Sequence, residues 1–416
     1  MSLKNDMHVS HILYCLIIAL STNAWSQSLG EVIVYNTSNS SLVYNQINCI
    51  KFDENNRLWI GTQNGLNTFD TFDNWDLFNV ENTSGGLSSN IIKAIEQKNN
   101  ISPTSMFIGT INGIHSISEE NFWFNYGETC SPNNGTINAL LYNNTLWSGS
   151  TDGLCIETTD GNWEIQNTST GWYSNNITSI KKNLNNDMIA IGTMNGGLIT
   201  YSSEFNIYYS SNSNILDNTV LDVMFDQNNN IIICTPQAGL GVFTENQSWI
   251  WFNTINSDLP SNSLKKVILD NDNSIWIATL ENGISHYKNN MFYNYNTSNS
   301  NLPDDKINCM EFDDSGNLWL GTNNSGLVKI ILPKTNINTN DENIINVYPT
   351  IFSSYITIES RQKLDVTMLD QTGREIQKIK LLNNSKTINT STYPSGVYFL
   401  NIISHNEHKS YMTIKN

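Results

Sequence analysis

The chain has little positive charge. It carries 21 lysine and arginine residues against 38 aspartate and glutamate residues, a formal net charge of −17 at pH 7. Such an acidic protein repels phosphate groups, so the composition argues against a nucleic-acid partner. Long hydrophobic runs are scarce too. The run from Ile12 to Leu20 is much shorter than the roughly 20 residues that cross a bilayer as a helix. No transmembrane segment is therefore expected in the mature chain.

The same run has the layout of a secretory signal. Lys4 precedes the apolar residues, and Ala24 and Ser26 supply small side chains at the positions that a signal peptidase reads. We expect residues 1–26 to be a signal peptide cleaved before Gln27. An uncleaved anchor is the less favoured alternative, because the run is short.

Histidine and cysteine are too few and too scattered to mark a site. Four histidines follow the signal, none at a metal-ligand or triad spacing, and the remaining cysteines form no CxxC pair. We therefore expect no catalytic residue, no metal site and no cofactor. Carboxylates are plentiful, so a glycosidase pair stays open.

The chain is rich in one repeated motif, an aliphatic run, a Gly-Thr-like pair, a tight turn and Gly-Leu, as in LWIGT at 58–62 before Asn64-Gly65-Leu66. Asn-Gly between two β runs is typical of a hairpin. The small residue of the motif recurs seven times, at intervals of 40 to 48 residues: Gly61, Gly109, Gly149, Gly192, Cys234, Ala278 and Gly321. This period predicts a seven-bladed β-propeller with one four-stranded sheet per repeat.

The chain also indicates how this ring closes. The last repeat stops after its third strand at Pro333, and the missing outer strand has its counterpart at residues 32–36. We expect this N-terminal strand to complete blade seven and remove the open edges. The all-β fold then comprises a propeller at 27–333, a polar linker at 334–345 and a small Ig-like antiparallel β-sandwich at 346–416.

Several recurrent residues are explained by the repeat itself. A tryptophan two residues before the small position predicts packing between blades. The Asp/Asn clusters at 53–56 and 313–317 lack the layout of a calcium loop, so turn-forming Asx chemistry is favoured. Cys49 and Cys309 occupy equivalent positions in blades one and seven. They form either a disulfide or, as favoured, two buried free thiols.

The repeat resembles a known family. The segments LSSN at 87–90 and DDSGNLWLGT at 313–322 are similar to the two-component-regulator propeller repeat. In that family the repeats often form the periplasmic sensors of hybrid histidine kinases that respond to polysaccharides. No transmembrane helix or kinase follows here, so the signalling role does not carry over.

The C-terminal segment resembles the type A sorting domain of the type IX secretion system. The matching pieces are VYP at 347–349, VTML at 366–369 with DQTGR at 370–374, and YPSGVYF at 393–399. The usual Tyr-Pro-Asn-Pro start is YPTI here. The resemblance implies export by the type IX secretion machinery, through the periplasm, to the outer cell surface or the medium. It also implies turn roles for Gly373 and Gly396. Arg374 either stays exposed for the translocon or serves as a hairpin charge.

Candidate ligand-binding residues form two groups. A ring two residues before the first apolar residue of each inner strand could face the channel and hydrogen-bond sugar hydroxyls, although capping of the incoming turn is favoured. Its members are Asn45, Asn90, Asn175, Asn218, Asn262 and Asp305. The second group departs from the repeat, namely the aromatics Trp172 and Tyr173, expected to be exposed, and Lys265 with Lys266 on an inner strand.

These observations favour a secreted or surface-held propeller that acts as a non-catalytic binding module for a glycan or a surface protein. Two alternatives stay open: a glycan-degrading hydrolase or lyase on the same scaffold, and an extracellular sensor-like ligand-binding protein. Two carboxylates facing each other about 5–10 Å apart across the channel mouth would favour the enzyme.

Overall fold

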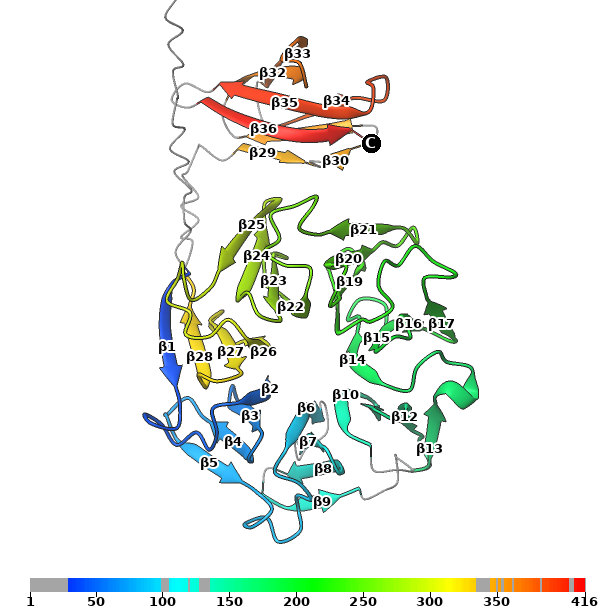
Figure 1. Cartoon of the computed structure of the whole chain (residues 1–416), viewed down its shortest axis with the longest axis vertical. Coiled ribbons are helices and arrows are strands. Elements are labelled where there is room, and N and C mark those ends of the chain that lie inside the picture. The colour runs from blue at the N-terminus through cyan, green and yellow to red at the C-terminus, as the bar shows by residue number, and fades with distance from the viewer. Residues whose placement is uncertain are drawn as a thin grey trace, which may run out of the picture.

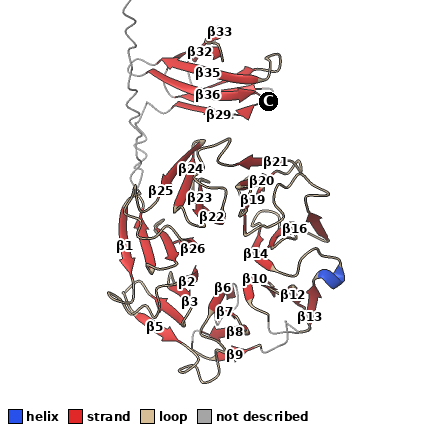
Figure 2. Cartoon of the chain, in the orientation of Figure 1, coloured by secondary structure: helices blue, strands red, loops and turns tan. Residues whose placement is uncertain are grey.

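The computed structural model describes residues 29–98, 105–118, 120–126, 135–333, 345–348, 351–352, 355–360, 363–381, 384–403 and 408–415. The predicted signal peptide and nearly all of the predicted linker lie outside these residues. The described structure is almost entirely β, as Figure 2 shows. Seven four-stranded antiparallel sheets surround a central axis, and the C-terminal strands form two further sheets (Figure 1). The predicted all-β propeller with seven blades is confirmed.

The strands of each blade follow one another outward from the axis. Blade 1 contains β2 (Ile47–Phe52), β3 (Leu58–Thr62), β4 (Leu66–Phe69) and β5 (Trp75–Phe78). Blade 2 contains β6 (Ile92–Lys98), β7 (Ser105–Thr110), β8 (Gly113–Ser118) and β9 (Trp123–Asn125). Blade 3 contains β10 (Ile137–Asn143), β11 (Thr145–Ser150), β12 (Leu154–Glu157) and β13 (Trp163–Gln166). Blade 4 follows the 3-10 helix η1 (Thr168–Thr170) and contains β14 (Ile177–Lys182), β15 (Ile189–Thr193), β16 (Leu198–Tyr201) and β17 (Phe205–Tyr208).

The remaining blades complete the ring. Blade 5 contains β18 (Asp222–Phe225), β19 (Ile231–Cys234), β20 (Leu240–Phe243) and β21 (Trp249–Phe252). Blade 6 contains β22 (Leu264–Leu269), β23 (Ile275–Thr279), β24 (Ile284–Lys288) and β25 (Met291–Tyr295). Blade 7 contains β26 (Ile307–Phe312), β27 (Leu318–Thr322), β28 (Leu327–Ile331) and, outermost, β1 (Glu31–Tyr35).

The strand β1 closes the propeller. It pairs antiparallel with β28, with Val34 opposite Val328 and Tyr35 opposite Leu327. The beginning of the described chain therefore supplies the fourth strand of the last blade (Figure 1). Closure by the N-terminal strand, expected from the truncated last repeat, is confirmed.

Adjacent blades pack through the small residue of the second strand. A Cβ atom added at Gly61 would lie 2.7 Å from Cγ2 of Ile92 in the next blade. One added at Gly321 would lie 2.6 Å from Cγ2 of Ile47 across the closure. Both distances are too short for a larger side chain, which explains the glycine of the motif. Trp319 is buried in one cluster with Ile47, as expected for packing between blades.

The C-terminal strands form a sandwich of two sheets around one core. One sheet has the order β29 (Ile345–Tyr348), β31 (Tyr355–Ser360), β34 (Asn384–Asn389). The other has the order β30 (Ile351–Phe352), β36 (His408–Lys415), β35 (Gly396–Ile403), β32 (Leu364–Asp370), β33 (Glu375–Leu381). The core includes Ile358, Val366 and Leu400. The pairs are antiparallel except for β30 with β36, which are parallel, so the expectation of an entirely antiparallel sandwich needs this correction.

Candidate functional site

The six Asn and Asp side chains predicted to ring the channel are engaged elsewhere. Each accepts, at 2.8 to 2.9 Å, a hydrogen bond from a backbone N–H group of the turn before its strand. The accepting Oδ1 atoms belong to Asn45, Asn90, Asn175, Asn218, Asn262 and Asp305. None of these residues lines the channel. The expected orientation toward the channel is therefore corrected: they cap the turn, as the favoured alternative held.

The aromatic pair of blade 4 divides between the core and the surface. Trp172 is only 6% exposed and packs against Phe205, with ring centroids 5.3 Å apart. The expectation that it is exposed is wrong, because it occupies the repeat position of Leu42, which is also buried. Tyr173 is 55% exposed, and its ring lies 4.7 Å from that of Tyr209.

The inner strands enclose a central channel with a volume of about 690 Å³. Residues of β2, β6, β10, β14, β22 and β26 line it, and Leu221 and Asp222 contribute from blade 5. Thr151, Met194 and Asn323, in turns between second and third strands, border it as well. The channel is therefore a cavity to which all seven blades contribute, at the position where we expected a ligand to bind.

In six of the seven blades, a β-bulge on the inner strand places one side chain in this channel. Six of the seven inner strands shift register by one residue directly after their first apolar residue. A bulged residue is left out of the ladder and its side chain is re-aimed. The bulged residues all line the channel: Asn48, Lys93, Asn138, Thr178, Lys265 and Asn308. We call this set the bulge ring, and Leu221 occupies the equivalent place in blade 5.

Four members of the bulge ring link their blade to the next. The side-chain amide of Asn48 donates to the carbonyl of Ile92 at 2.7 Å, and that of Asn308 donates to the carbonyl of Ile47 at 2.8 Å. Asn138 and Thr178 make the same link to the following blades. In blades 2, 5 and 6 this link is absent, and the residues there are Lys93, Leu221 and Lys265. Sequence reasoning singled out Lys265 but missed the ring.

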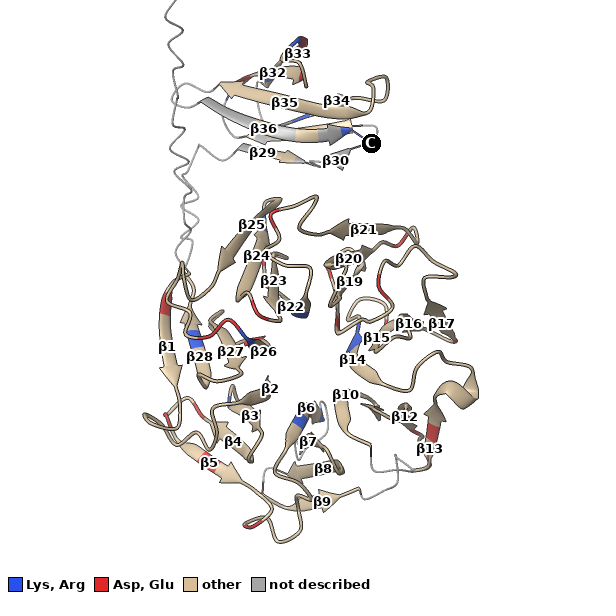
Figure 3. Ribbon diagram, viewed as in Figure 1, with Lys and Arg blue, Asp and Glu red and all other residues tan. Residues whose placement is uncertain are grey.

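The channel lining has a net positive charge, unlike the propeller as a whole. The lining includes five lysines and three carboxylates: Lys51, Lys93, Lys181, Lys265, Lys266, Glu96, Asp222 and Glu311. Figure 3 shows basic segments on β6, β14 and β22 around the central opening. Because the chain has a net charge of −17, an anion meets less repulsion at this cavity than over the acidic remainder of the propeller.

Some of these charges are paired within the protein. Lys51 lies 3.8 Å from Glu96, and the charges of Glu96 and Glu311 raise its pKa. Lys266 lies 3.2 Å from the buried carboxylate of Asp222, which raises the pKa of the lysine although burial opposes this. These contacts compensate the charge at two points of the channel wall.

Lys265 is held differently. Its ammonium group donates a hydrogen bond to Oδ1 of Asn308, a neutral partner. Burial lowers the pKa of Lys265, and the positive charges of Lys266 and Lys93 lower it further. Lys93 makes no hydrogen bond or ion pair with any residue that the structure describes. Both bulge-ring lysines therefore lack a carboxylate of their own.

The two cysteines of the channel wall are free thiols. Cys49 and Cys309 are unpaired, as favoured from the sequence, and burial raises the pKa of the Cys309 thiol to about 12. A thiol that stays protonated at neutral pH is a poor nucleophile and a poor metal ligand. No group of three metal-ligating side chains occurs among the described residues.

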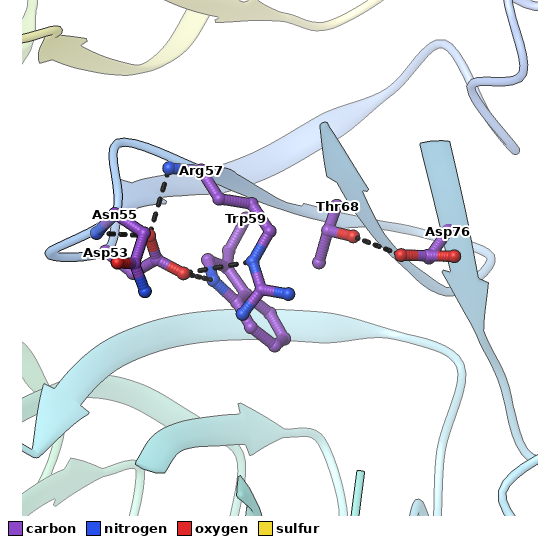
Figure 4. A network of polar contacts seen from close by, with 6 residues as sticks. All are labelled: Asp53, Asn55, Arg57, Trp59, Thr68 and Asp76. Carbon is purple, nitrogen blue, oxygen red and sulfur yellow. Dashed lines mark hydrogen bonds and ion pairs between the residues drawn. The ribbon is translucent and has the colours of Figure 1, made fainter. Parts of the chain in front are cut away.

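The Asp-rich hairpin of blade 1 is a structural network (Figure 4). Oδ1 of Asp53 accepts hydrogen bonds from the backbone N–H groups of Asn55 and Arg57. Its Oδ2 accepts a hydrogen bond of 2.9 Å from Nε1 of Trp59. Oδ2 also accepts a hydrogen bond from Nε of Arg57. The guanidinium of Arg57 lies 4.7 Å from the centroid of the Trp59 ring. This arrangement is the Asx chemistry predicted for these hairpins, with the carboxylate already occupied.

The sorting-domain residues singled out from the sequence lie at turns of the sandwich. Gly373 and Gly396 have φ angles of 82° and 154°. Such backbone conformations favour glycine. The side chain of Arg374 is 75% exposed, and its Nε lies 3.0 Å from Oδ2 of Asp370. The guanidinium thus braces the hairpin and remains open to solvent.

Family models match both parts of the chain. Residues 346–416 match the secretion system C-terminal sorting domain, and residues 41–64 and 301–324 match the two component regulator propeller. The two resemblances noted in the sequence are thereby confirmed. Comparison with curated protein sequences gives no match.

Solved structures share the fold at low identity. The extracellular domain described as that of a hybrid two component system of B. thetaiotaomicron is 18% identical with a TM-score of 0.63; the match covers 93% of this chain and 57% of that one. PorZ, a surface component of the type-IX secretion system of Porphyromonas gingivalis, is 15% identical with a TM-score of 0.55, covering 92% and 61%. This chain thus spans less than two thirds of either. Virginiamycin B lyase from Staphylococcus aureus is 11% identical with a TM-score of 0.58, covering 72% and 98%.

The sorting domain indicates where the protein goes. A domain of this kind directs export to the outer cell surface or secretion, and it implies the corresponding secretion machinery as a partner. Among the described residues, no helix is long and apolar enough to cross a membrane.

Proposed function

We propose that this exported protein is a non-catalytic binding module that takes its ligand, a glycan or a segment of a surface protein, in the central channel. The bulge ring carries this proposal. Six of the seven inner strands interrupt their ladders at the same place, and each interruption directs one side chain into the cavity. Bulges of this kind are often found where a strand has to aim a side chain at a site.

The dimensions of the channel favour the glycan. Small-molecule sites have volumes of roughly 300–1,000 Å³, and the channel volume of about 690 Å³ falls within that range. Gln46, Thr136 and Asn176 add amide and hydroxyl groups to the lining. Such groups pair with sugar hydroxyls, whereas a folded protein partner would need a broad, flatter surface.

The state of the channel carboxylates supports a non-catalytic role. The carboxylate of Asp222 accepts hydrogen bonds from Ser179, Lys266 and the backbone of Val267. Glu96 is paired with Lys51. A general acid or base needs a proton-transfer group within reach of the substrate. Asp222 and Glu96 already have protein partners, which leaves Glu311 as the third carboxylate of the lining.

Filling the channel tests the proposal. Leu221 lines the channel but takes part in none of the links between blades, so Leu221→Trp should obstruct the cavity and leave those links intact. On a glycan array probed with the full chain, we expect Leu221→Trp to weaken the bound signal at least about tenfold, since overlap with a tryptophan removes most ligand contacts.

Leu184→Trp is the matched control, because Leu184 is 92% exposed and does not line the channel. Its signal should equal that of the wild type. Equal binding by both variants, with unchanged melting temperatures, would place the ligand elsewhere and refute the channel. Silence on the array together with capture of one surface protein would favour the protein ligand.

A further inference from the structure

We infer that the channel recognises an acidic saccharide, whose carboxylate or sulfate group is held between Lys93 and Lys265 of the bulge ring. This inference rests on the proposed function and specifies the chemical class of its ligand. It depends on three observations: the positions of the two lysines in the bulge ring, the lack of a carboxylate paired with either lysine, and the polar side chains between them.

The bulge ring is divided into a cationic and a neutral arc. Blades 6, 7, 1 and 2 are consecutive around the closure, and they contribute, in order, Lys265, Asn308, Asn48 and Lys93. Blades 3, 4 and 5 contribute Asn138, Thr178 and Leu221, which carry no charge. The two lysines thus flank two amides at one repeat position of the channel wall. Because they are three blades apart, their strands β6 and β22 lie on opposite sides of the opening (Figure 1).

The amides between the lysines are fixed in place. The side chain of Asn308 accepts a hydrogen bond from the ammonium group of Lys265 and donates one to the carbonyl of Ile47. The side chain of Asn48 donates to the carbonyl of Ile92 and receives a hydrogen bond from Gln63. Because their partners hold them, these side chains keep the shape of the arc and do not neutralise its charge.

The remaining charges of the channel are arranged otherwise. Lys51 and Lys181 lie four residues after the first apolar residue of their strands, at the same repeat position as Glu96 and Glu311. Cations and carboxylates are therefore mixed at that level. No residue of the bulge ring is a carboxylate. Asp222 directly follows Leu221 and is paired with Lys266, so neither Lys93 nor Lys265 is neutralised by a carboxylate of the channel wall.

Burying an ammonium group without an anion is unfavourable, and the lowered pKa of Lys265 reflects this cost. Lysines that merely pack their stems against a surface place the ammonium group in bulk water. Here the ammonium group of Lys265 donates a hydrogen bond to the side-chain amide of Asn308 inside the cavity. An oxyanion between the two lysines would relieve both the desolvation and their mutual repulsion, since charge-assisted hydrogen bonds are among the stronger contacts in proteins.

The first experiment uses the wild-type full chain and inorganic sulfate. Lysine amines are modified by reductive methylation in sodium sulfate or in sodium chloride of equal ionic strength, and each residue is quantified by mass spectrometry. We expect sulfate to slow the labelling of Lys93 and Lys265 and to leave Lys98 unaffected, although Lys98 lies on the same strand as Lys93. Equal labelling in the two salts would overturn the inference.

The second experiment identifies the source of the oxyanion. Three sugars are titrated calorimetrically into the full chain. They are trigalacturonate, a sulfated trisaccharide, and the neutral trisaccharide obtained by reducing the carboxyl groups of trigalacturonate. We expect one or both acidic sugars to bind at least about tenfold more tightly than the neutral one. A single hydrogen bond to a charged group contributes enough free energy for a ratio of this size. Lys93→Gln with Lys265→Gln should remove this preference, and Lys98→Gln should keep it.

The outcomes separate this inference from the proposed function. If the neutral sugar binds as tightly as the acidic ones and Leu221→Trp abolishes both, the channel binds glycans and the role of the lysines is wrong. If sulfate protects the lysines but no acidic sugar binds, the anion site stands and its assignment to a saccharide is refuted. Should the double variant fail to fold, the labelling experiment still tests the two lysines and the sugar titrations still test the saccharide, because both use the unaltered chain.

Discussion

His115 and His286 are buried inside blades 2 and 6, where desolvation lowers the pKa of each to about 4. Their neighbours are structural: His115 contacts Ser88 and His286 contacts Ser274. Neither lines the channel. At the scale of single residues, titratable groups therefore fall into two sets, those that serve packing and the lysines that face the cavity.

Replacement of His286 by phenylalanine tests the first set. A histidine whose folded pKa of about 4 lies below its usual 6.5 is protonated more readily in the unfolded chain, so stability is retained above pH 6.5 and falls as the pH drops toward 4. In His286→Phe this loss should be smaller, by at most about 3 kcal/mol. The stack on Trp276, at 4.0 Å between centroids, can be kept by the new ring.

Urea denaturation of both proteins at several pH values between 4 and 7 measures the difference. At pH 7 the histidine is neutral, so the two free energies of unfolding should differ only by the lost hydrogen bond to Ser274, about 1 kcal/mol. Parallel pH profiles would show that His286 is not protonated on unfolding in this range, contrary to the expectation.

At the scale of elements, the strand β1 and the bulges have opposite effects on the sheets. The pairing of β1 with β28 extends a ladder and removes an edge, which also removes a site of association with other chains. The bulges interrupt ladders at the centre, and the interrupted positions become the channel wall. Closure therefore contributes stability, and the bulges contribute the candidate site.

A pair of aspartate substitutions in β1 tests closure. Val34 packs against the core cluster shared by blades 6 and 7, and its neighbour Ile33 does not belong to that cluster. Val34→Asp places an unpaired charge at a partly buried position and should lower the free energy of unfolding by about 1–3 kcal/mol. Ile33→Asp, on the same strand, should cost less than half as much. Similar urea midpoints for the two variants would contradict the role of β1 in the core.

The whole molecule combines an acidic propeller with a C-terminal sandwich that matches a sorting domain. The propeller carries the channel, and the sandwich has its own core of residues such as Ile358 and Leu400. The proposed binding site and the sorting domain thus lie in separate parts of the chain. A ligand site that meets the outside of the cell is consistent with both.

Deletion of residues 346–416 tests this separation. In a cell that carries the type IX secretion machinery, the truncated protein should accumulate in the periplasm, and the full chain should reach the surface or the medium. Cell fractionation with an antibody against the propeller measures the distribution. Purified truncated protein should give the glycan-array signal of the full chain. Export without residues 346–416 would refute the sorting role.

Most of the fold could be read from the sequence because it depends on local patterns. The period of the motif with Gly61 and Gly321 gave the number of blades, since each blade needs one small residue beneath its neighbour. The incomplete last repeat predicted the role of β1, because an open edge is unfavourable. The turn and sorting motifs act over a few residues as well, and their assignments agree with the structure.

The candidate site depended on tertiary structure. Strict alternation along a strand does not reveal which residue is bulged, so Asn48 and Lys93 could not be placed in the channel from the pattern. Trp172 was expected at the surface because it departs from the repeat, yet the core accepts its indole at a buried position. Repetition along the chain thus determined the scaffold. That Lys265 and Lys93 line one channel, although they are more than 150 residues apart in the sequence, was decided only when the ring closed, because closure makes blades 6, 7, 1 and 2 consecutive.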